Sequence, residues 1–106
     1  MNQSEKMTAL ADPRRQEILE LLSVAPCSVA ELARQLPVTR PAVSQHLKVL
    51  LDAGLVTQQS VGTRNIYRLD PEGVAALRDH LDAMWQKALS AFKKSVEHPH
   101  PDQEKE

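Results

Sequence analysis

The sequence predicts one mainly α-helical domain that carries a single β-hairpin. Before residue 54, apolar residues recur at helical spacing in short segments that begin with typical capping residues. From 55 to 69 the pattern changes to β-branched residues on both sides of a polar turn. A long apolar stripe follows, uninterrupted by Gly or Pro from Val74 to His98. The expected helices cover about 5–11, 13–24, 28–36, 39–53 and 71–96, and the hairpin covers 55–69.

The first two helices are separated by a helix start signal. Met7 and Leu10 lie at helical spacing in the first segment. Asp12 followed by Pro13 is typical of an N-cap with proline in the first turn. The second helix therefore begins at Pro13.

The next two helices have clear boundaries. Ser28 and Glu31 fit a capping box, in which each residue satisfies the other's backbone N–H. Pro37 breaks this helix, and Thr39 caps the next one. Gly54 is placed to end that helix in a left-handed conformation.

The hairpin and the last helix complete the expected domain. Residues 55–60 and 65–69 form the two strands, and residues 61–64 form the turn. Asp70 followed by Pro71 repeats the cap-and-proline start. We expect residues 1–98 to form the domain and the polar tail 99–106 to be disordered.

Composition limits the class of protein. A chain of 106 residues with net charge −1 suits one domain, and its start shows no apolar signal segment, so a cytoplasmic location is expected. From Arg34 to Arg68 the chain has five basic residues and one acid, Asp52. A basic middle can meet DNA phosphates, although an ordinary solvated surface explains the charges equally well.

The order of elements points to a specific motif. Two short helices joined at Pro37-Val38 and followed by a hairpin are typical of a winged helix-turn-helix. On a helical wheel, Val43, Leu47 and Leu50 share one narrow sector. The opposite face is polar and mildly basic, as a recognition helix requires, although any surface helix has a polar face.

The polar face offers suitable chemistry for reading DNA. Gln45 can pair with adenine and Arg40 with guanine, whereas Lys48 suits a phosphate. His46 either touches DNA or packs at the helix edge. The hairpin tip adds basic and hydroxyl groups, unless it is a plain exposed turn. The predicted DNA-contacting residues are Thr39, Arg40, Pro41, Ser44, Gln45, His46, Lys48, Thr63, Arg64 and Arg68.

Four stretches carry a family resemblance: Leu10–Arg15, Leu32-Ala33, Arg40–Leu50 and Ala53–Val56. Together they resemble the ArsR/SmtB family of winged-helix repressors, over about residues 7 to 95. The resemblance implies a homodimeric repressor of double-stranded DNA that leaves its operator when a signal arrives.

The family's metal ligands are missing at the positions that would hold them. The thiolates of the family's Cys-Val-Cys box correspond to Ser28 and Ala30, and Asp79 and His80 are adjacent rather than separated by one residue. Ala91 stands where a second histidine would fall. We therefore expect no metal and no cofactor, with weak binding by His98 and His100 as the minor alternative.

Cys27 is the only cysteine and a possible thiol sensor. A nearby helix N-terminus would lower the pKa of its thiol, but the chain has no second cysteine to form a disulfide with it. A small, half-buried side chain is the more ordinary interpretation. The inducer is unknown, and a small molecule is equally open.

The last helix predicts a dimer. Its apolar stripe is too broad for a lone surface helix, so the excess should meet a second copy together with the first helix. The predicted interface consists of Met7, Leu10, Leu77, Leu81, Met84, Trp85, Ala88, Leu89 and Phe92. Alternatively, Trp85 and Phe92 close the core of a monomer. Two-fold symmetry predicts an inverted-repeat operator.

A protein-interaction module and an enzyme are the other classes of function to compare with a DNA-binding protein. The motif can bind a protein instead of DNA. An enzyme is not expected, because no Cys/His or Ser/His/Asp grouping is brought together by the predicted elements.

Overall fold

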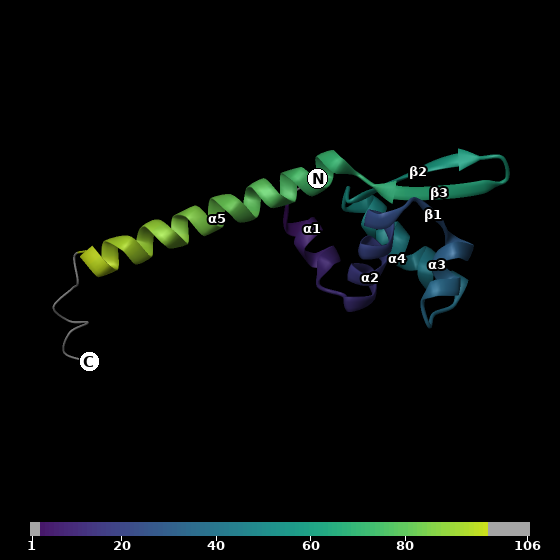
Figure 1. The fold of residues 1–106 in the computed structure, drawn as a ribbon, viewed down its shortest axis with the longest axis horizontal. Helices are drawn as coiled ribbons and strands as arrows, with labels where there is room; N and C mark the ends of the chain where they lie inside the picture. Colours follow the sequence, from purple (N-terminus) through teal and green to yellow (C-terminus); the bar gives the residue numbers. More distant parts are fainter. Residues whose placement is uncertain (1–2, 98–106) are drawn as a thin grey trace.

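The computed structural model describes residues 3–97 (Figure 1). Within them it has five helices and three strands: α1 (Gln3–Leu10), α2 (Pro13–Val24), β1 (Cys27–Ser28), α3 (Val29–Gln35), α4 (Arg40–Asp52), β2 (Val56–Val61), β3 (Arg64–Leu69) and α5 (Pro71–Glu97). The five predicted helices and the hairpin are confirmed. α1 starts two residues earlier than predicted, and α3 and α4 each start one residue later than predicted. The predicted tail 99–106, with His98 and His100, lies outside the described residues.

One strand was missed. β1 pairs antiparallel with β3, with Cys27 opposite Tyr67 and Ser28 opposite Ile66, so the strand order in the sheet is β1-β3-β2. Two residues are too few to show an alternating pattern. Ser28 also has a second role, because it caps α3.

The predicted caps are present. The Asp12 carboxylate accepts from the backbone N–H of Arg14 at 2.7 Å. At the start of α3, Ser28 Oγ accepts from the Glu31 N–H at 3.2 Å, and the Ser28 N–H donates to Glu31 Oε1 at 3.0 Å. These bonds satisfy N–H groups that lack partners within their own helices. The helix starts are therefore set by local sequence.

α4 is held by its apolar stripe. Val43, Leu47 and Leu50 are fully buried, and they pack in one core with Ile18 of α2 and Leu32 of α3. Burial of each such side chain contributes about 1.5–3 kcal/mol. The helix ends at Asp52, and Gly54 follows it in a Schellman arrangement, with φ of +78° and the Leu55 N–H donating to Leu50 O at 3.0 Å.

α5 begins on the body and then leaves it. The Asp70 carboxylate caps it by accepting from the Gly73 N–H at 3.3 Å. Of its 27 residues only Gly73 and Leu77 are buried, and Leu77 joins the core of its own chain. The C-terminal part of the helix extends away from the other elements (Figure 1).

Two expectations about α5 change. Trp85 and Phe92 do not close the monomer core, because their exposed fractions are 62% and 66%. Leu77, which was assigned to a dimer interface, is buried inside the subunit instead. Within residues 3–97, no helix combines the length and the apolarity needed to cross a membrane.

Gly73 is required by a close approach. A Cβ atom added there would overlap the backbone carbonyl oxygen of Gly54, just after α4. Gly73→Ala should therefore lower the free energy of unfolding by about 1–3 kcal/mol, the usual cost of overpacking. At an ordinary helix position the same change would raise it by about 1 kcal/mol.

Urea unfolding at one protein concentration measures this effect. The control is Ala83→Gly at an exposed position of α5, which should lose about 1 kcal/mol from helix propensity alone. A higher unfolding midpoint for Gly73→Ala would show that the contact with Gly54 does not constrain the fold.

Candidate nucleic-acid interface

The outward face of α4 gathers several of the predicted DNA-contacting residues. Pro41, Ser44, Gln45 and Lys48 are exposed and line a shallow depression of about 350 Å³. Arg40 is exposed at the first position of the helix. Because the buried stripe holds the opposite side of α4 in the core, this face is directed to solvent.

Thr39 and Lys48 already have partners within the chain. Thr39 Oγ1 accepts from the Ala42 N–H at 3.3 Å, which leaves its own hydroxyl proton available to donate. Lys48 Nζ lies 3.1 Å from Asp52 Oδ2, and both side chains are largely exposed. A pair this exposed contributes little to stability. Lys48 can therefore exchange its carboxylate for a phosphate at small cost.

His46 faces a different neighbour. It is half-buried, and its Nδ1 lies 3.5 Å from Nη1 of Arg15 on α2. Arg15 also donates from Nε to the carbonyl oxygen of Ala9 at 2.6 Å. Arg15 thus joins the end of α1, the start of α2 and the middle of α4. Sequence reasoning did not select it, since a contact across 31 positions leaves no local pattern.

The start of α2 is electrostatically stabilised at the same place. The backbone N–H of Arg14, together with the N–H and guanidinium of Arg15, holds the pKa of the Asp12 carboxyl below its usual value. Arg15 Nη1 lies 3.7 Å from Asp12 Oδ2. The carboxylate therefore stays charged as both cap and ion-pair partner.

The hairpin of β2 and β3 forms the wing. Its strands pair from Val56 with Leu69 to Val61 with Arg64, and the two-residue turn has Gly62 at φ +63°. This φ suits glycine at the first position of a type II′ turn. Every side chain from 57 to 65 is exposed. Thr63 lies in the turn, and Arg68 Nη2 donates to Gln59 Oε1 at 3.2 Å along the wing.

Arg64 is held against the body. Its Nη2 lies 2.8 Å from Glu31 Oε1 and 3.3 Å from Ser28 Oγ, at the start of α3. Hydrogen bonds from the backbone and hydroxyl of Ser28, with the nearby Arg64, lower the pKa of Glu31. The sequence suggested a free cation at the wing tip; in the structure this guanidinium has a carboxylate partner.

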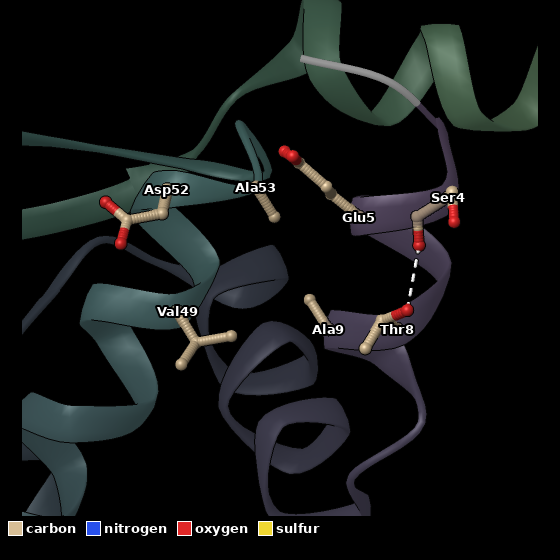
Figure 2. A pocket seen from close by; sticks show the side chains of 7 residues that line it. All are labelled: Ser4, Glu5, Thr8, Ala9, Val49, Asp52 and Ala53. Atoms are coloured by element: carbon tan, nitrogen blue, oxygen red, sulfur yellow. Dashed lines mark hydrogen bonds between the residues drawn. The ribbon is translucent and has the colours of Figure 1, made fainter.

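A second opening lies between α1 and the C-terminal end of α4 (Figure 2). It measures about 490 Å³ and is lined by Ser4, Glu5, Thr8, Ala9, Val49, Asp52 and Ala53. Two carboxylates on its walls disfavour a phosphate there. The part of α4 suited to DNA is therefore its N-terminal half.

Cys27 does not have the environment expected of a reactive thiol. It lies in β1, is 6% exposed and donates from Sγ to Ala25 O at 3.4 Å. Burial, followed by the negative charge of Glu31, raises the pKa of the thiol. The expected lowering by a helix N-terminus is wrong, because desolvation of the thiolate outweighs it.

Candidate metal ligands are scattered in the part of the chain that the structure describes. Residues 3–97 contain no group of three or more His, Cys, Asp or Glu side chains placed to hold a metal ion. Ser28, at a position where the family's box would carry a thiolate, is buried and bonded to Glu31 and Arg64.

The chain is similar in sequence to known transcriptional regulators. Residues 12–58 match the family model described as bacterial regulatory protein, arsR family. The chain is 54% identical to an HTH-type transcriptional regulator of Mycobacterium tuberculosis over 89 residues, 84% of this chain and 83% of the relative. It is 42% identical to the arsenical resistance operon repressor of Bacillus subtilis over 74 residues, 69% of this chain and 70% of that one.

A solved structure agrees with the fold. The solution structure of a homodimeric winged helix-turn-helix DNA-binding domain from Mycobacterium bovis, described as a possible ArsR-family transcriptional regulator, matches with a TM-score of 0.65 and 30% identity. The match covers 92% of this chain and 84% of the other.

The raised pKa of Cys27 generates a testable prediction. At pH 7.5 the folded protein should react with a disulfide thiol reagent at least about tenfold more slowly than the unfolded chain in urea, because thiolate and access are both reduced. Absorbance of the released thiol dye gives the rate. Reaction at the same rate in both states would restore Cys27 as a candidate sensor.

Proposed function

Because the chain belongs to the ArsR family of bacterial regulatory proteins and is a transcriptional regulator with a DNA-binding winged helix-turn-helix, we propose that it is a homodimeric, cytoplasmic repressor. It binds an inverted-repeat operator and needs no metal ion for its DNA affinity. The observation that carries the proposal is the polar N-terminal face of α4, presented by a helix whose other side is fully buried.

The exposed residues of the recognition helix α4 have separate roles in this proposal. Gln45 and Arg40 read base edges in the major groove, since their side chains can form bidentate hydrogen bonds with adenine and guanine. Thr39, Ser44 and Lys48 bind phosphates and set the register. His46 packs against Arg15 at the edge of this face and orients the helix.

The wing supplies the second contact. Its exposed turn, with Thr63, and the exposed Arg68 face a phosphate or the minor groove. Arg64 stands at the base of the turn, where Glu31 holds it.

The dimer is proposed from the exposed side of α5. Large apolar side chains there, including Leu81, Met84, Trp85 and Phe92, are 43–66% exposed, and Met7 of α1 is 40% exposed. Such a surface is unfavourable in water unless a partner covers it. A second copy is the partner we propose, as in the Mycobacterium bovis homodimer. The proposed interface consists of Met7, Leu81, Met84, Trp85, Ala88, Leu89 and Phe92, with the half-buried Leu10 at its edge.

The order of apolar residues on α5 supports an antiparallel, two-fold pairing. About the point between Gln86 and Lys87, the six α5 residues of the proposed interface form three pairs at equal distances: Leu81 and Phe92, Met84 and Leu89, Trp85 and Ala88. A two-fold axis at this point would place Leu81 of one copy opposite Phe92 of its partner. The helices would then bury one continuous stripe.

Repression without a metal is supported by the donor set. The Bacillus subtilis relative is a repressor of an arsenical resistance operon. In this chain the described His, Cys and acidic side chains are dispersed, and Cys27 is buried. We therefore propose that the signal that releases the protein from DNA is not a metal ion bound by thiolates.

DNA binding by α4 predicts different effects for two substitutions. Gln45→Ala should reduce the preference for the operator over random DNA by about 1–3 kcal/mol, because a base contact is lost. Lys48→Ala should weaken binding to both DNAs and reduce the slope of log affinity against log salt by about one. Fluorescence anisotropy with a duplex from the region upstream of its own gene measures both quantities.

Lys87→Ala is the matched control, since it removes the same charge from α5. It should leave the salt slope unchanged. Unchanged specificity in Gln45→Ala together with an unchanged slope in Lys48→Ala would show that another surface contacts DNA. Repeating the wild-type titration with zinc tests metal independence: dissociation at low micromolar zinc would contradict it.

The two-fold register predicts a specific cross-link. The double variant with Leu81→Cys and Phe92→Cys should form covalent dimers on mild oxidation, because opposed residues bring their Cβ atoms within disulfide range. Leu81→Cys alone should not, since two Leu81 sites would lie about 16 Å apart along the helices. Non-reducing electrophoresis separates these outcomes. Efficient cross-linking of Leu81→Cys alone would contradict the register.

A further inference from the structure

We propose that the Arg64–Glu31 ion pair is a latch that fixes the wing relative to the recognition helix, and that both are positioning residues for DNA binding. The proposal rests on the proposed function for its DNA readout. It assigns Glu31, an acid within the first helix of the DNA-binding motif, a role in increasing DNA affinity.

One carboxylate oxygen connects two elements. Glu31 Oε1 accepts from the Ser28 N–H at 3.0 Å and from Arg64 Nη2 at 2.8 Å. The same Arg64 nitrogen lies 3.3 Å from Ser28 Oγ. The capping box at the start of α3 therefore also holds the first residue of β3. The Arg64 and Glu31 side chains are 59% and 36% exposed, so solvent screens this charge-assisted bond less than it screens the Lys48–Asp52 pair.

Near its tip, the wing has no buried side chain. β1 pairs with β3 at Tyr67 and Ile66, and every side chain from 57 to 65 is exposed. An isolated two-stranded hairpin is marginally stable in water. Arg64 extends the attachment of the wing two residues beyond Ile66, to the edge of the turn.

The attachment also reaches the recognition helix. Glu31 belongs to α3, whose Leu32 is fully buried in the same core as Val43 and Leu47 of α4. α3 is thus rigidly placed with respect to α4. A wing tied to the start of α3 keeps a set distance from the recognition helix. The wing and the helix can then contact one DNA duplex without an entropic cost for ordering the wing on binding.

The latch and simple charge repulsion predict opposite effects of Glu31→Gln on DNA affinity. Removing an acid near DNA should strengthen binding to a polyanion if only net charge matters. If the latch orders the wing, Glu31→Gln should instead weaken binding by about tenfold, a change worth about 1.4 kcal/mol. Glutamine at this position of a capping box still accepts from the N-cap N–H, so α3 keeps its cap, while the negative charge that holds the Arg64 guanidinium is removed.

The experiment is a double-mutant cycle with Glu31→Gln, Arg64→Gln and both together. Affinity is measured by anisotropy against the upstream duplex and a random-sequence duplex over a range of salt. The latch predicts that Glu31→Gln weakens binding without changing the salt slope, and that the double variant binds no more weakly than Arg64→Gln. Glu20→Gln, an exposed acid on α2, is the control and should bind equally or slightly more tightly.

Two DNA results would overturn the latch. Equal or tighter binding by Glu31→Gln is one, and full additivity of the two substitutions is the other. A slope reduced by about one in Arg64→Gln, with Glu31→Gln unchanged, would make Arg64 a direct phosphate contact instead.

Amide hydrogen exchange on the DNA-free protein keeps the latch testable by itself. In Glu31→Gln, exchange should accelerate in residues 61–65 and stay unchanged in α4. If the wild type bound neither duplex, the proposed function would fail, and this measurement would still decide the latch. Unchanged exchange in 61–65 would overturn it. If Glu31→Gln fails to fold, Arg64→Lys is measured in its place. This variant keeps the charge but not the planar guanidinium, and it should show the same acceleration.

Discussion

The burial of one side of α4 is the constraint on which the rest of this molecule depends. Val43, Leu47 and Leu50 have no exposed surface, and they bring α2, α3 and β2 into a single core. A helix anchored in this way has only one side left for solvent. Its polar residues are therefore presented as a rigid surface, and ligand recognition carries little ordering cost.

The segment that follows α4 fixes the position of α5, the proposed dimer helix, relative to α4. Gly54 reverses the chain through a left-handed conformation, and the wing follows immediately. After the wing, α5 begins against the same glycine, where Gly73 leaves no space for a side chain. The orientation of α5 relative to α4 is thus set by backbone contact. In a dimer, this contact would fix the separation of the two recognition helices.

Electrostatic links refine the arrangement. Arg15 connects α1, the cap of α2 and His46 of α4, and Arg64 connects the wing to α3. Both guanidiniums have hydrogen-bonding partners within the chain. The basic middle of the sequence therefore overstates the free positive charge: Lys48 and Arg64 both have carboxylate partners. In the function proposed above, these cations position neighbouring elements as well as attract phosphate.

Local sequence is sufficient to define the elements, their caps and the polar face of α4. Those features follow from periodicity and from neighbours within four residues, as at Ser28 with Glu31 or Asp12 with Arg14. Tertiary structure alone decided the contacts between distant residues: β1 beside β3, Arg64 on Glu31, His46 on Arg15, and Leu77 inside the core rather than at an interface. A side chain's partner across 30 positions depends on how whole elements pack, and packing is a property of the assembled core. The same reason explains Cys27, whose thiol looked activated beside a helix start and is in fact desolvated within the sheet.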